Sequence, residues 1–585
     1  MPEASVRGIL ARRGALALGA YAALAVAAAF HFSDQINPDG VAYLRIAGYY
    51  GSGELSRAVS AYWSPLYSWL LAPWVALGVP ALLATKLLGA LLAVAWVHGV
   101  GLLAPRYVES APARALLLAA TAVGALAWSM WTIAPDLLLA VLLTYYFHVV
   151  AHPALTARPG RAFASGLLGG LAYLAKAYAL PFFLAHFLGT IVLAGWARAD
   201  GAGRAGGARW RDWARAAGAG LLGFALLAGV WVAILSVTQG RLTLTTAVSR
   251  NEPIRGDHSV FLPFALRLSP EQRLSRVEPG RLTTWETPDR FRPTSAPLVS
   301  DPAVVLRGWL RELAGNLITI RDRLSGFDYF HLAIPGVLGA VFLALLRRHE
   351  RGVAAPEIWG AFTIALYAGG YLPLVATEER YFWPLAGLLL VLAGGCAEKF
   401  ARAAVGLAAS PQSRPARLVL AAVAVVALSF FLVGAQGLVE LGTTPRPEYR
   451  SVARRVAEAA RRNGTTVRGP IAGNEWPRTL YTAYAMSLPM AGVTTSRDPA
   501  ALADEMAAVG VRLYLVFDDR TLAAQIRASG RFRHLGDITP RGAPGTVVAA
   551  FELSGRNGCG VPVAGSSPAG ISGREGRASR DCSRT

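Results

Sequence analysis

Long apolar runs without charge decide the fold class of this chain. Residues 113–128 carry no charge after Arg114, residues 137–150 carry none at all, and similar runs recur along the first three quarters of the sequence. Charged residues make up 16 % of the 585 residues, against ~25 % in soluble proteins. Because a membrane span needs roughly 20 apolar residues, the sequence predicts an α-helical polytopic membrane protein. A small soluble domain, a disordered chain and a secreted disulfide scaffold are excluded.

The order of apolar runs and arginines predicts the topology. Short cytoplasmic loops carry the excess of Lys and Arg, and alternate loops of this chain are rich in arginine, from Arg106 and Arg114 to Arg414 and Arg417. The N-terminus is therefore expected in the cytoplasm. About eleven spans (range about 11–13) are expected, near residues 14–32, 81–104, 112–130, 135–151, 163–180, 181–197, 217–238, 329–346, 357–375, 381–397 and 418–438.

Residues 63–79 are also apolar, but a crossing there would place the arginine-rich loops outside. This segment is therefore predicted to be a juxtamembrane or half-buried part of the first outside loop, and Pro65 and Pro73 agree with a broken helix. No small-residue cleavage site follows residues 14–32, so we expect a first span there and no cleavable signal peptide.

The net charge of +21 comes mainly from loop arginines, so nucleic acid is not expected as a partner. The three cysteines are too few and too scattered for a disulfide framework or a zinc cluster. The chain is expected in the cell membrane, with membrane lipids around it.

Composition divides the chain into two folded parts and a tail. Residues 1–438 form the predicted transmembrane domain, with a first outside loop at 33–80 and a large outside loop at 240–327. Helix and strand patterns then alternate, which predicts an α/β domain over 439–554 outside the cytoplasm. Residues 555–585 lack a core and are expected to be disordered. The clearest elements of the α/β domain are helices at 448–462 and 498–509 and strands at 512–517 and 547–553.

The first outside loop places a carboxylate at the start of a short helix. Pro38 favours the first helical position and Asn37 can cap it, so Asp39 falls in the first turn. Tyr43 follows one turn later on the same face. Asp39 can simply complement the helix dipole, or it can act as a general base toward an acceptor outside the cytoplasm. Spacing alone leaves both interpretations open.

Asp136 follows Pro135 at the predicted outer mouth of a span. It can be an ordinary first-turn residue, or it can face Asp39 on the same side of the membrane. In the second case Asp39 and Asp136 are candidate ligands of a divalent cation, which takes carboxylate oxygens, although two carboxylates alone specify no metal. Asp136 and Tyr43 are also candidate acceptor contacts.

Lysine is rare in this chain. Of the 57 Lys and Arg residues, only Lys86, Lys176 and Lys399 are lysines, and Lys399 lies at a predicted cytoplasmic end. At 1.5 Å per residue, Lys86 lies about 9 Å below the outer end of its span, and Lys176 lies about 22 Å from Arg161 at the inner end. Both ammonium groups are expected near the outer headgroups. A snorkelling lysine is the ordinary explanation, and a site for a lipid-borne phosphate is the functional one.

Arg380 lies at the start of a predicted span, on the same outer side of the membrane as Lys86 and Lys176. Glu378 and Glu379 can simply neutralise its charge. The guanidinium can instead bind a phosphate through two hydrogen bonds, which makes Arg380 a candidate phosphate ligand beside Lys86 and Lys176.

Six short motifs occur in one order along residues 10–400. They are Asp39-Gly-Val-Ala-Tyr43-Leu-Arg-Ile-Ala47, Ser64-Pro-Leu-Tyr-Ser-Trp-Leu-Leu-Ala72, Ala84-Thr-Lys86-Leu-Leu-Gly-Ala-Leu-Leu, Pro135-Asp136-Leu-Leu-Leu-Ala, Gly169-Gly-Leu-Ala-Tyr-Leu-Ala-Lys176 and Glu379-Arg-Tyr-Phe-Trp-Pro384. Together they resemble the GT-C membrane glycosyltransferases, in particular the branch that contains the protein O-mannosyltransferases and the lipid A aminoarabinose transferase. The α/β domain matches no subgroup.

The resemblance implies a GT-C-like catalytic domain that moves a hexose or pentose, with inversion, from a polyprenyl-phosphate donor. The implied acceptor is an extracytoplasmic glycan, lipid or protein. Asp39 matches the catalytic carboxylate of the family, and Asp136 matches a second acidic position. Lys86, Lys176 and Arg380 match basic positions and are expected at the donor phosphate. The protein mannosyltransferases have an Asp-Glu pair where this chain has a single Asp39, which disfavours a protein acceptor.

The competing class is a transporter or flippase of a lipid-linked glycan. Transporters usually show repeats, broken helices in corresponding halves and ionisable groups at the midplane. Here no internal repeat is found, and the candidate polar residues gather near the predicted outer surface. The sequence therefore favours the transferase.

Overall fold

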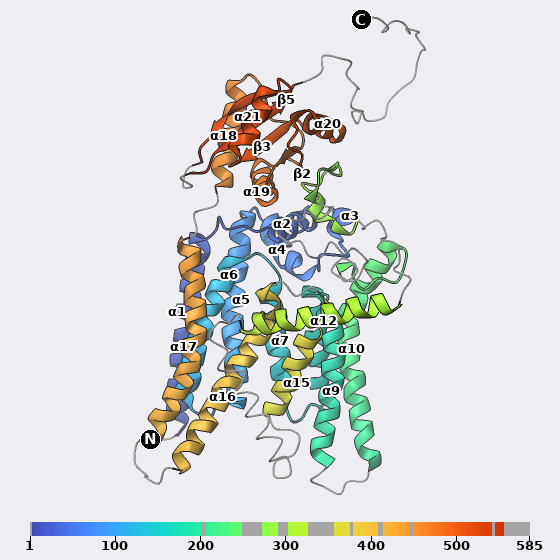
Figure 1. The fold of residues 1–585 in the computed structure, drawn as a ribbon. Coiled ribbons are helices and arrows are strands. Elements are labelled where there is room, and N and C mark those ends of the chain that lie inside the picture. Colours follow the sequence, from blue (N-terminus) through green and yellow to red (C-terminus); the bar gives the residue numbers. More distant parts are fainter. Residues whose placement is uncertain are drawn as a thin grey trace, which may run out of the picture.

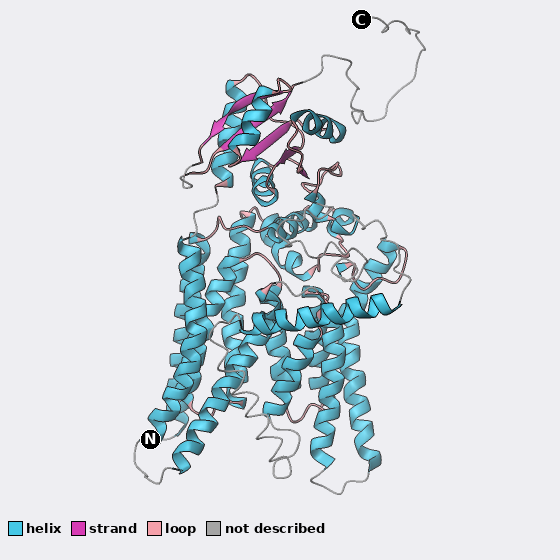
Figure 2. Cartoon of the chain, viewed as in Figure 1, coloured by secondary structure: helices cyan, strands magenta, loops and turns pink. Residues whose placement is uncertain are grey.

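The computed structural model describes residues 3–199, 206–247, 272–290, 302–325, 356–374, 378–407, 414–443, 448–540 and 545–554. Long helices from the apolar runs form a bundle, and an α/β unit lies beyond one end of it (Figure 1). Figure 2 shows the strands gathered in that unit. The predicted fold class, a helical multi-pass membrane protein with a C-terminal α/β domain, is confirmed.

Ten of the predicted spans coincide with a described helix, and the span expected near 329–346 lies outside the described residues. Six of these helices contain a segment long and apolar enough to cross a membrane: α1, α5, α6, α10, α16 and α17. The ten helices are α1 (Glu3–His31), α5 (Ala81–Leu103), α6 (Ala111–Trp131), α7 (Asp136–Val150), α8 (Pro159–Ala175), α9 (Ala179–Ala199), α10 (Gly206–Gln239), α15 (Pro356–Gly369), α16 (Trp383–Leu407) and α17 (Arg414–Thr443).

Several helix ends differ from the predicted spans, among them the ends of α8 and α17. Helix α8 ends at Ala175, and Lys176 has extended backbone (φ −154°, ψ 125°). The side chain of Lys176 donates a hydrogen bond to Asp136 at the start of α7. Helix α17 continues past residue 438 to Thr443. A hydrogen bond between the side chains of Gln436 and Glu440, one turn apart, supports this last part of the helix.

Three short helices lie between the bundle and the α/β unit: α2 (Pro38–Gly51), α3 (Leu55–Ala58) and α4 (Leu66–Ala76). Helix α4 has 11 residues, so it is about 16 Å long and cannot cross a ~30 Å hydrocarbon layer. This agrees with the prediction that residues 63–79 do not form a full crossing, but Pro73 lies inside the continuous helix α4, so the predicted break at this residue is wrong. Helix α12 (Pro302–Ser325) runs across the bundle helices rather than along them (Figure 1).

The α/β unit contains a five-stranded mixed sheet of order β2-β1-β3-β5-β4. Strands β1, β2 and β3 are parallel, and β5 pairs antiparallel with both β3 and β4. The hydrophobic side chains of α18 and α19 pack on one face, and those of α20 and α21 on the other. The elements are α18 (Tyr449–Arg462), β1 (Ile471–Gly473), α19 (Trp476–Met486), β2 (Met490–Val493), α20 (Pro499–Val509), β3 (Leu513–Phe517), α21 (Arg520–Ala528), β4 (Phe532–Ile538) and β5 (Val548–Leu553).

The four elements predicted for this unit are present as α18, α20, β3 and β5. Asp498 caps α20 by accepting hydrogen bonds from two backbone N–H groups, and Gly510 ends the helix at φ 78°, a conformation that suits glycine. The remaining strands and helices were not predicted. The tail, residues 555–585, lies outside the described residues.

Candidate active site

The start of α2 is fixed by a contact with the turn before α7. Asn37 occupies the N-cap position as predicted, but its side chain does not cap α2; Asn37 Oδ1 accepts a hydrogen bond from the N–H of Ile133 at 2.8 Å. A Cβ atom at Gly40 would lie 2.8 Å from Ile133 Cβ, so only glycine allows this approach. The contact brings the first turn of α2, which contains Asp39, close to the first turn of α7, which contains Asp136.

Lys176 and Arg380 join these two carboxylates. Lys176 Nζ lies 2.5 Å from Asp136 Oδ1 and 4.0 Å from the ring centre of Tyr381. Arg380, in the 3₁₀ helix η8 (Glu379–Phe382), places Nη2 2.7 Å from Asp39 Oδ2 and Nη1 3.8 Å from Asp136 Oδ2. We call Asp39, Asp136, Lys176, Glu378 and Arg380 the ion-pair cluster.

Glu378 completes the cluster at its exposed side. Arg380 Nε lies 2.5 Å from Glu378 Oε2, as the neutralising interpretation of Glu378 predicted. The side chain of Glu378 is 49 % exposed, whereas that of Asp136 is 3 % exposed, and Asp39 and Lys176 lie between these extremes. The cluster is therefore buried at Asp136 and open to solvent at its other side.

Tyr43 lies one turn after Asp39 and is buried. Its ring packs edge-on against Trp63 and Tyr67. Burial, together with the charges of Asp39 and Asp136, raises the pKa of Tyr43 well above the usual range. The hydroxyl therefore stays protonated near neutral pH, which suits a hydrogen-bond donor to a substrate and not a base.

The structure does not bring Lys86 to this cluster. Its ammonium group is buried and donates a hydrogen bond to the backbone carbonyl of Met130, 2.7 Å away, at the end of α6. Lys86 supports the end of α6, just before the turn that contains Ile133. Its predicted contact with the donor phosphate stays a prediction.

The arrangement does not fit a resident divalent cation at Asp39 and Asp136. Oxygens of both carboxylates already contact Arg380 or Lys176, whose positive charges compete with a cation for them. Among the described residues, no group of three or more His, Cys, Asp or Glu side chains could hold a metal ion.

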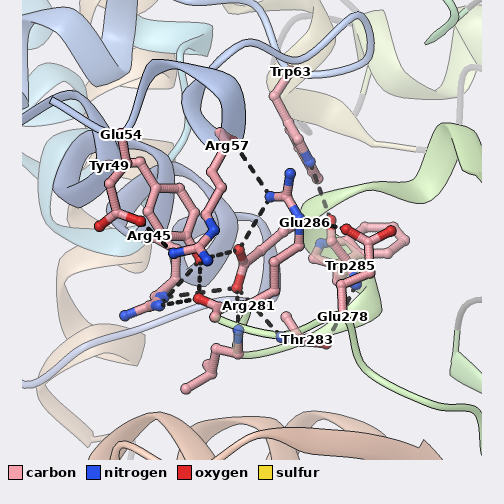
Figure 3. A network of polar contacts seen from close by, with 12 residues as sticks. Arg45, Tyr49, Glu54, Arg57, Trp63, Glu278, Arg281, Thr283, Trp285 and Glu286 are labelled. Atoms are coloured by element: carbon pink, nitrogen blue, oxygen red, sulfur yellow. Dashed lines mark hydrogen bonds and ion pairs between the residues drawn. The ribbon is translucent and has the colours of Figure 1, made fainter. Parts of the chain in front are cut away.

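A second polar network holds the other end of α2 (Figure 3). Its centre is Glu286, which is fully buried and accepts hydrogen bonds from the hydroxyl of Tyr49 at 2.7 Å and the N–H of Leu282 at 2.8 Å. The guanidinium groups of Arg281 and Arg45 lie 3.5 and 3.7 Å from its carboxylate.

The sequence interpretation missed this network and also missed Tyr381. Thr283 and Glu286 form a capping box around the 3₁₀ helix η5 (Thr284–Glu286), and the spacing of Thr and Glu was a signal for it. Tyr381 follows Arg380 in the quoted motif, but nothing in the sequence indicated its contact with Lys176.

The segment that contains Glu286 also borders the sheet. The N–H of Leu274 donates to the carbonyl of Val493 at 3.0 Å, and the N–H of Met490 donates to the carbonyl of Leu282 at 2.7 Å. Residues 272–290 thus connect the edge strand β2 with α2, the helix that contains Asp39.

The chain shares its overall fold with two solved structures of ArnT, which agrees with the resemblance to the GT-C glycosyltransferases that the motifs indicated. ArnT from Cupriavidus metallidurans in the apo state matches with a TM-score of 0.50 and 16 % identity, over 92 % of this chain and 98 % of ArnT. ArnT bound to undecaprenyl phosphate matches with a TM-score of 0.50 and 15 % identity, over 91 % and 97 % of the two chains.

A third solved structure, the arabinofuranosyltransferase AftD from Mycobacteria, has a TM-score of 0.45 and 14 % identity, and the match covers 92 % of this chain but 40 % of AftD. At the level of sequence, neither a protein-family model nor a curated protein matches the chain. At such identities the likeness to ArnT concerns the fold.

Proposed function

We propose that this chain is an inverting glycosyltransferase that moves a hexose or pentose from a polyprenyl-phosphate donor to an acceptor outside the cytoplasm. The acceptor is an envelope glycan, a lipid or a protein. The observation that supports this proposal best is the ion-pair cluster, which is buried at Asp136 and exposed at its other side. In this cluster Arg380 contacts Asp39 and Asp136, and Lys176 contacts Asp136. One of the solved structures with this fold is bound to undecaprenyl phosphate, a ligand of the same class as the proposed donor.

Lys176 and Arg380 are the proposed ligands of the donor phosphate. Both are cations in a partly desolvated site, where electrostatic contacts are stronger than in water. A phosphate that binds Arg380 competes directly with Asp39 for the same guanidinium. Donor binding therefore frees the carboxylate of Asp39, which ties activation of the base to the presence of the donor.

The transfer then needs one displacement. Asp39 takes the proton of an acceptor hydroxyl while the hydroxyl oxygen attacks the anomeric carbon of the sugar. The bond between this carbon and the phosphate oxygen breaks, and its electron pair leaves with the phosphate. Lys176 and Arg380 stabilise the negative charge that grows there. A single displacement inverts the anomeric configuration without a covalent intermediate, in contrast to retaining enzymes.

No step uses a metal ion, so EDTA should leave transfer unchanged.

The variant Asp39→Asn tests whether Asp39 is the general base. The amide keeps the shape of the side chain but cannot accept the proton, and loss of a positioned general base typically costs ~10²–10⁴ in rate. The assay follows labelled sugar from polyprenyl-phosphate donor, extracted from native membranes, into the envelope fraction of a strain that lacks this chain. Donor binding by the purified variant is measured in parallel and should be retained.

Asp34→Asn is the matched control, because Asp34 precedes the same helix but pairs with Arg450 outside the cluster. It should transfer sugar at a near-normal rate. Normal transfer by Asp39→Asn together with an inactive Asp34→Asn would move the base to Asp34 and contradict the proposed role of Asp39. Export of intact lipid-linked glycan without any new glycosidic bond would instead indicate a flippase.

A further inference from the structure

A groove lies between the α/β unit and the start of α5, apart from the ion-pair cluster. Its volume is about 880 Å³. One wall is a face of α18, and a second wall is the end of α19 with the loop that follows it. The floor is formed by Pro80, Ala81 and Leu82, where the candidate membrane span Ala81–Arg106 begins. The described residues that line the groove include no member of the cluster.

The wall formed by α18 is basic. Arg454, Ala457 and Arg461 recur at helical spacing and therefore share one face of the helix. Arg450, one turn before Arg454, lines the groove as well, but its Nη1 lies 2.5 Å from Asp34 Oδ1, so its charge is compensated. Arg454 and Arg461 are exposed, and within the described part of the chain their side chains have no ion-pair or hydrogen-bond partner.

The second wall and the floor are mostly apolar. Met486 and Leu488 line the groove at the end of α19 and in the loop that follows it, and Pro80 and Leu82 line it at the start of α5. A ligand that fits this groove has an anionic part for α18 and an apolar part for the other side. Since the floor is the first turn of a candidate span, the groove opens where lipid headgroups meet the protein.

We propose that this groove binds the phosphate-bearing headgroup of an anionic membrane lipid. Arg454 and Arg461 bind the phosphate by charge-assisted hydrogen bonds, and Met486 and Leu488 contact the apolar start of the acyl chains. The inference goes beyond sugar transfer and does not depend on it, because the groove contains no residue of the ion-pair cluster.

A lipid in this groove has a structural consequence. Helix α19, which forms one wall, also packs against α2, the helix that contains Asp39. A bound headgroup therefore links α18 and α19 to the membrane surface next to the candidate active site.

The test compares two double variants of the full chain, purified in a neutral detergent. Arg454→Gln/Arg461→Gln removes the charges of the groove. Arg455→Gln/Arg462→Gln removes the same number of charges from the same helix at positions that do not line the groove. Binding of fluorescent phosphatidylglycerol is titrated against each, with phosphatidylcholine as the zwitterionic probe. Since a basic residue near anionic lipid contributes about fivefold in affinity, the first pair should weaken binding about 30-fold. The second pair should change it by less than about threefold.

Ala457→Phe fills the groove without a change of charge and should also abolish binding, which keeps the test valid if the arginine variant folds poorly. Equal losses in the two arginine pairs would mean non-specific attraction to the charged helix and would overturn the proposal. Equal binding of phosphatidylcholine would overturn it too. Displacement of phosphatidylglycerol by millimolar inorganic phosphate would identify a site for a soluble anion instead.

Discussion

Arg380 connects the three carboxylates of the candidate site, because its guanidinium contacts Asp39, Asp136 and Glu378. The cluster has two cations and three carboxylates, so its formal charge is +2 − 3 = −1. The contact with Glu378 is exposed and screened by solvent, whereas Asp136 is buried and depends on Lys176 and Arg380 for compensation. A phosphate can replace Asp39 at Arg380 without leaving Asp136 unpaired.

Substitution of the two cluster cations should weaken donor binding. A hydrogen bond to a charged group contributes about 1.5–3 kcal/mol, so Lys176→Gln and Arg380→Gln should each raise the Kd for a polyprenyl-phosphate donor about 10- to 100-fold. The measurement is donor binding by the purified full chain, with thermal unfolding in detergent as a check of folding. Normal donor affinity in both variants would rule out the phosphate role.

Lys86→Met decides whether Lys86 belongs to the same site. The sequence motif that contains Lys86 predicts a loss of donor affinity similar to that of Lys176→Gln and Arg380→Gln. The hydrogen bond from Lys86 to the carbonyl of Met130 predicts a different result, a lower thermal stability with unchanged donor affinity. The two readouts separate the phosphate role from a structural one.

Acid should destabilise the α/β unit through Asp518. Partial burial opposes ionisation of this group, but the hydrogen bonds from Arg478 and from the N–H of Val547 lower its pKa below the usual 3.8. A carboxyl with a lowered folded-state pKa stabilises the fold above its unfolded pKa, and this stabilisation is lost as the pH falls from about 4 through the folded pKa. Asp518→Asn should therefore unfold at a lower temperature at pH 6 and show a shallower decline below pH 4. An unchanged pH profile would contradict this.

At the scale of elements, close glycine contacts set the distance between bundle helices. Helices α8 and α10 approach so closely that a Cβ atom at Gly166 would lie 1.9 Å from the carbonyl oxygen of Gly220, and one at Gly223 would lie 2.4 Å from that of Phe163. Small residues at such positions let helix backbones pack together within a membrane. Because Lys176 directly follows the last residue of α8, this packing also fixes where the lysine enters the cluster.

Gly166→Ala should force α8 and α10 apart. Overpacking of this kind typically costs ~1–3 kcal/mol, and the clash is with backbone, which cannot rotate away. We expect a lower melting temperature in detergent and weaker donor binding. The control is Gly218→Ala in α10, where a Cβ meets nothing within 4 Å; it should be neutral or stabilising, since alanine favours helix over glycine. Equal melting temperatures and equal donor binding of the two variants would show that the close contact between α8 and α10 does not determine stability or donor binding.

At the scale of the whole molecule, α2 connects the two folded parts. Val41 of α2 packs into the core of the α/β unit, whereas Tyr43 and Leu44 pack into the core of the bundle. The hydroxyl of Tyr449 in α18 also donates to the carbonyl of Asp34, just before α2. The α/β unit and the bundle therefore both hold the helix that contains Asp39.

The arginine sidedness of the loops predicts the orientation in the membrane, with the α/β unit outside the cytoplasm. Reporter fusions at Leu438 and Ser554 test this: a reporter active only after export should be active at both sites, and a cytoplasmic reporter at neither. The reverse pattern would place the ion-pair cluster on the cytoplasmic side and exclude an extracytoplasmic acceptor.

The sequence by itself determined the class of fold and the place of single residues along their elements. Charge-free runs predict helices because backbone groups in lipid must be satisfied within the segment, and the pattern after residue 438 predicted α18, α20, β3 and β5. The same reasoning placed Asp39 in the first turn of a helix. Lys86 and Lys176, however, appeared equivalent from their expected depth.

Only the tertiary structure decided which of these residues meet. Asp39 and Arg380 are 341 positions apart and form an ion pair, whereas Lys86 bonds to the backbone at the end of α6. Hydropathy gives the length and depth of a span. It does not give the rotation or the neighbours of the helix, because surfaces that face lipid and surfaces that face other helices are both apolar. The close contacts at Gly40, Gly166 and Gly220 determine which helices are neighbours and how they are rotated toward each other.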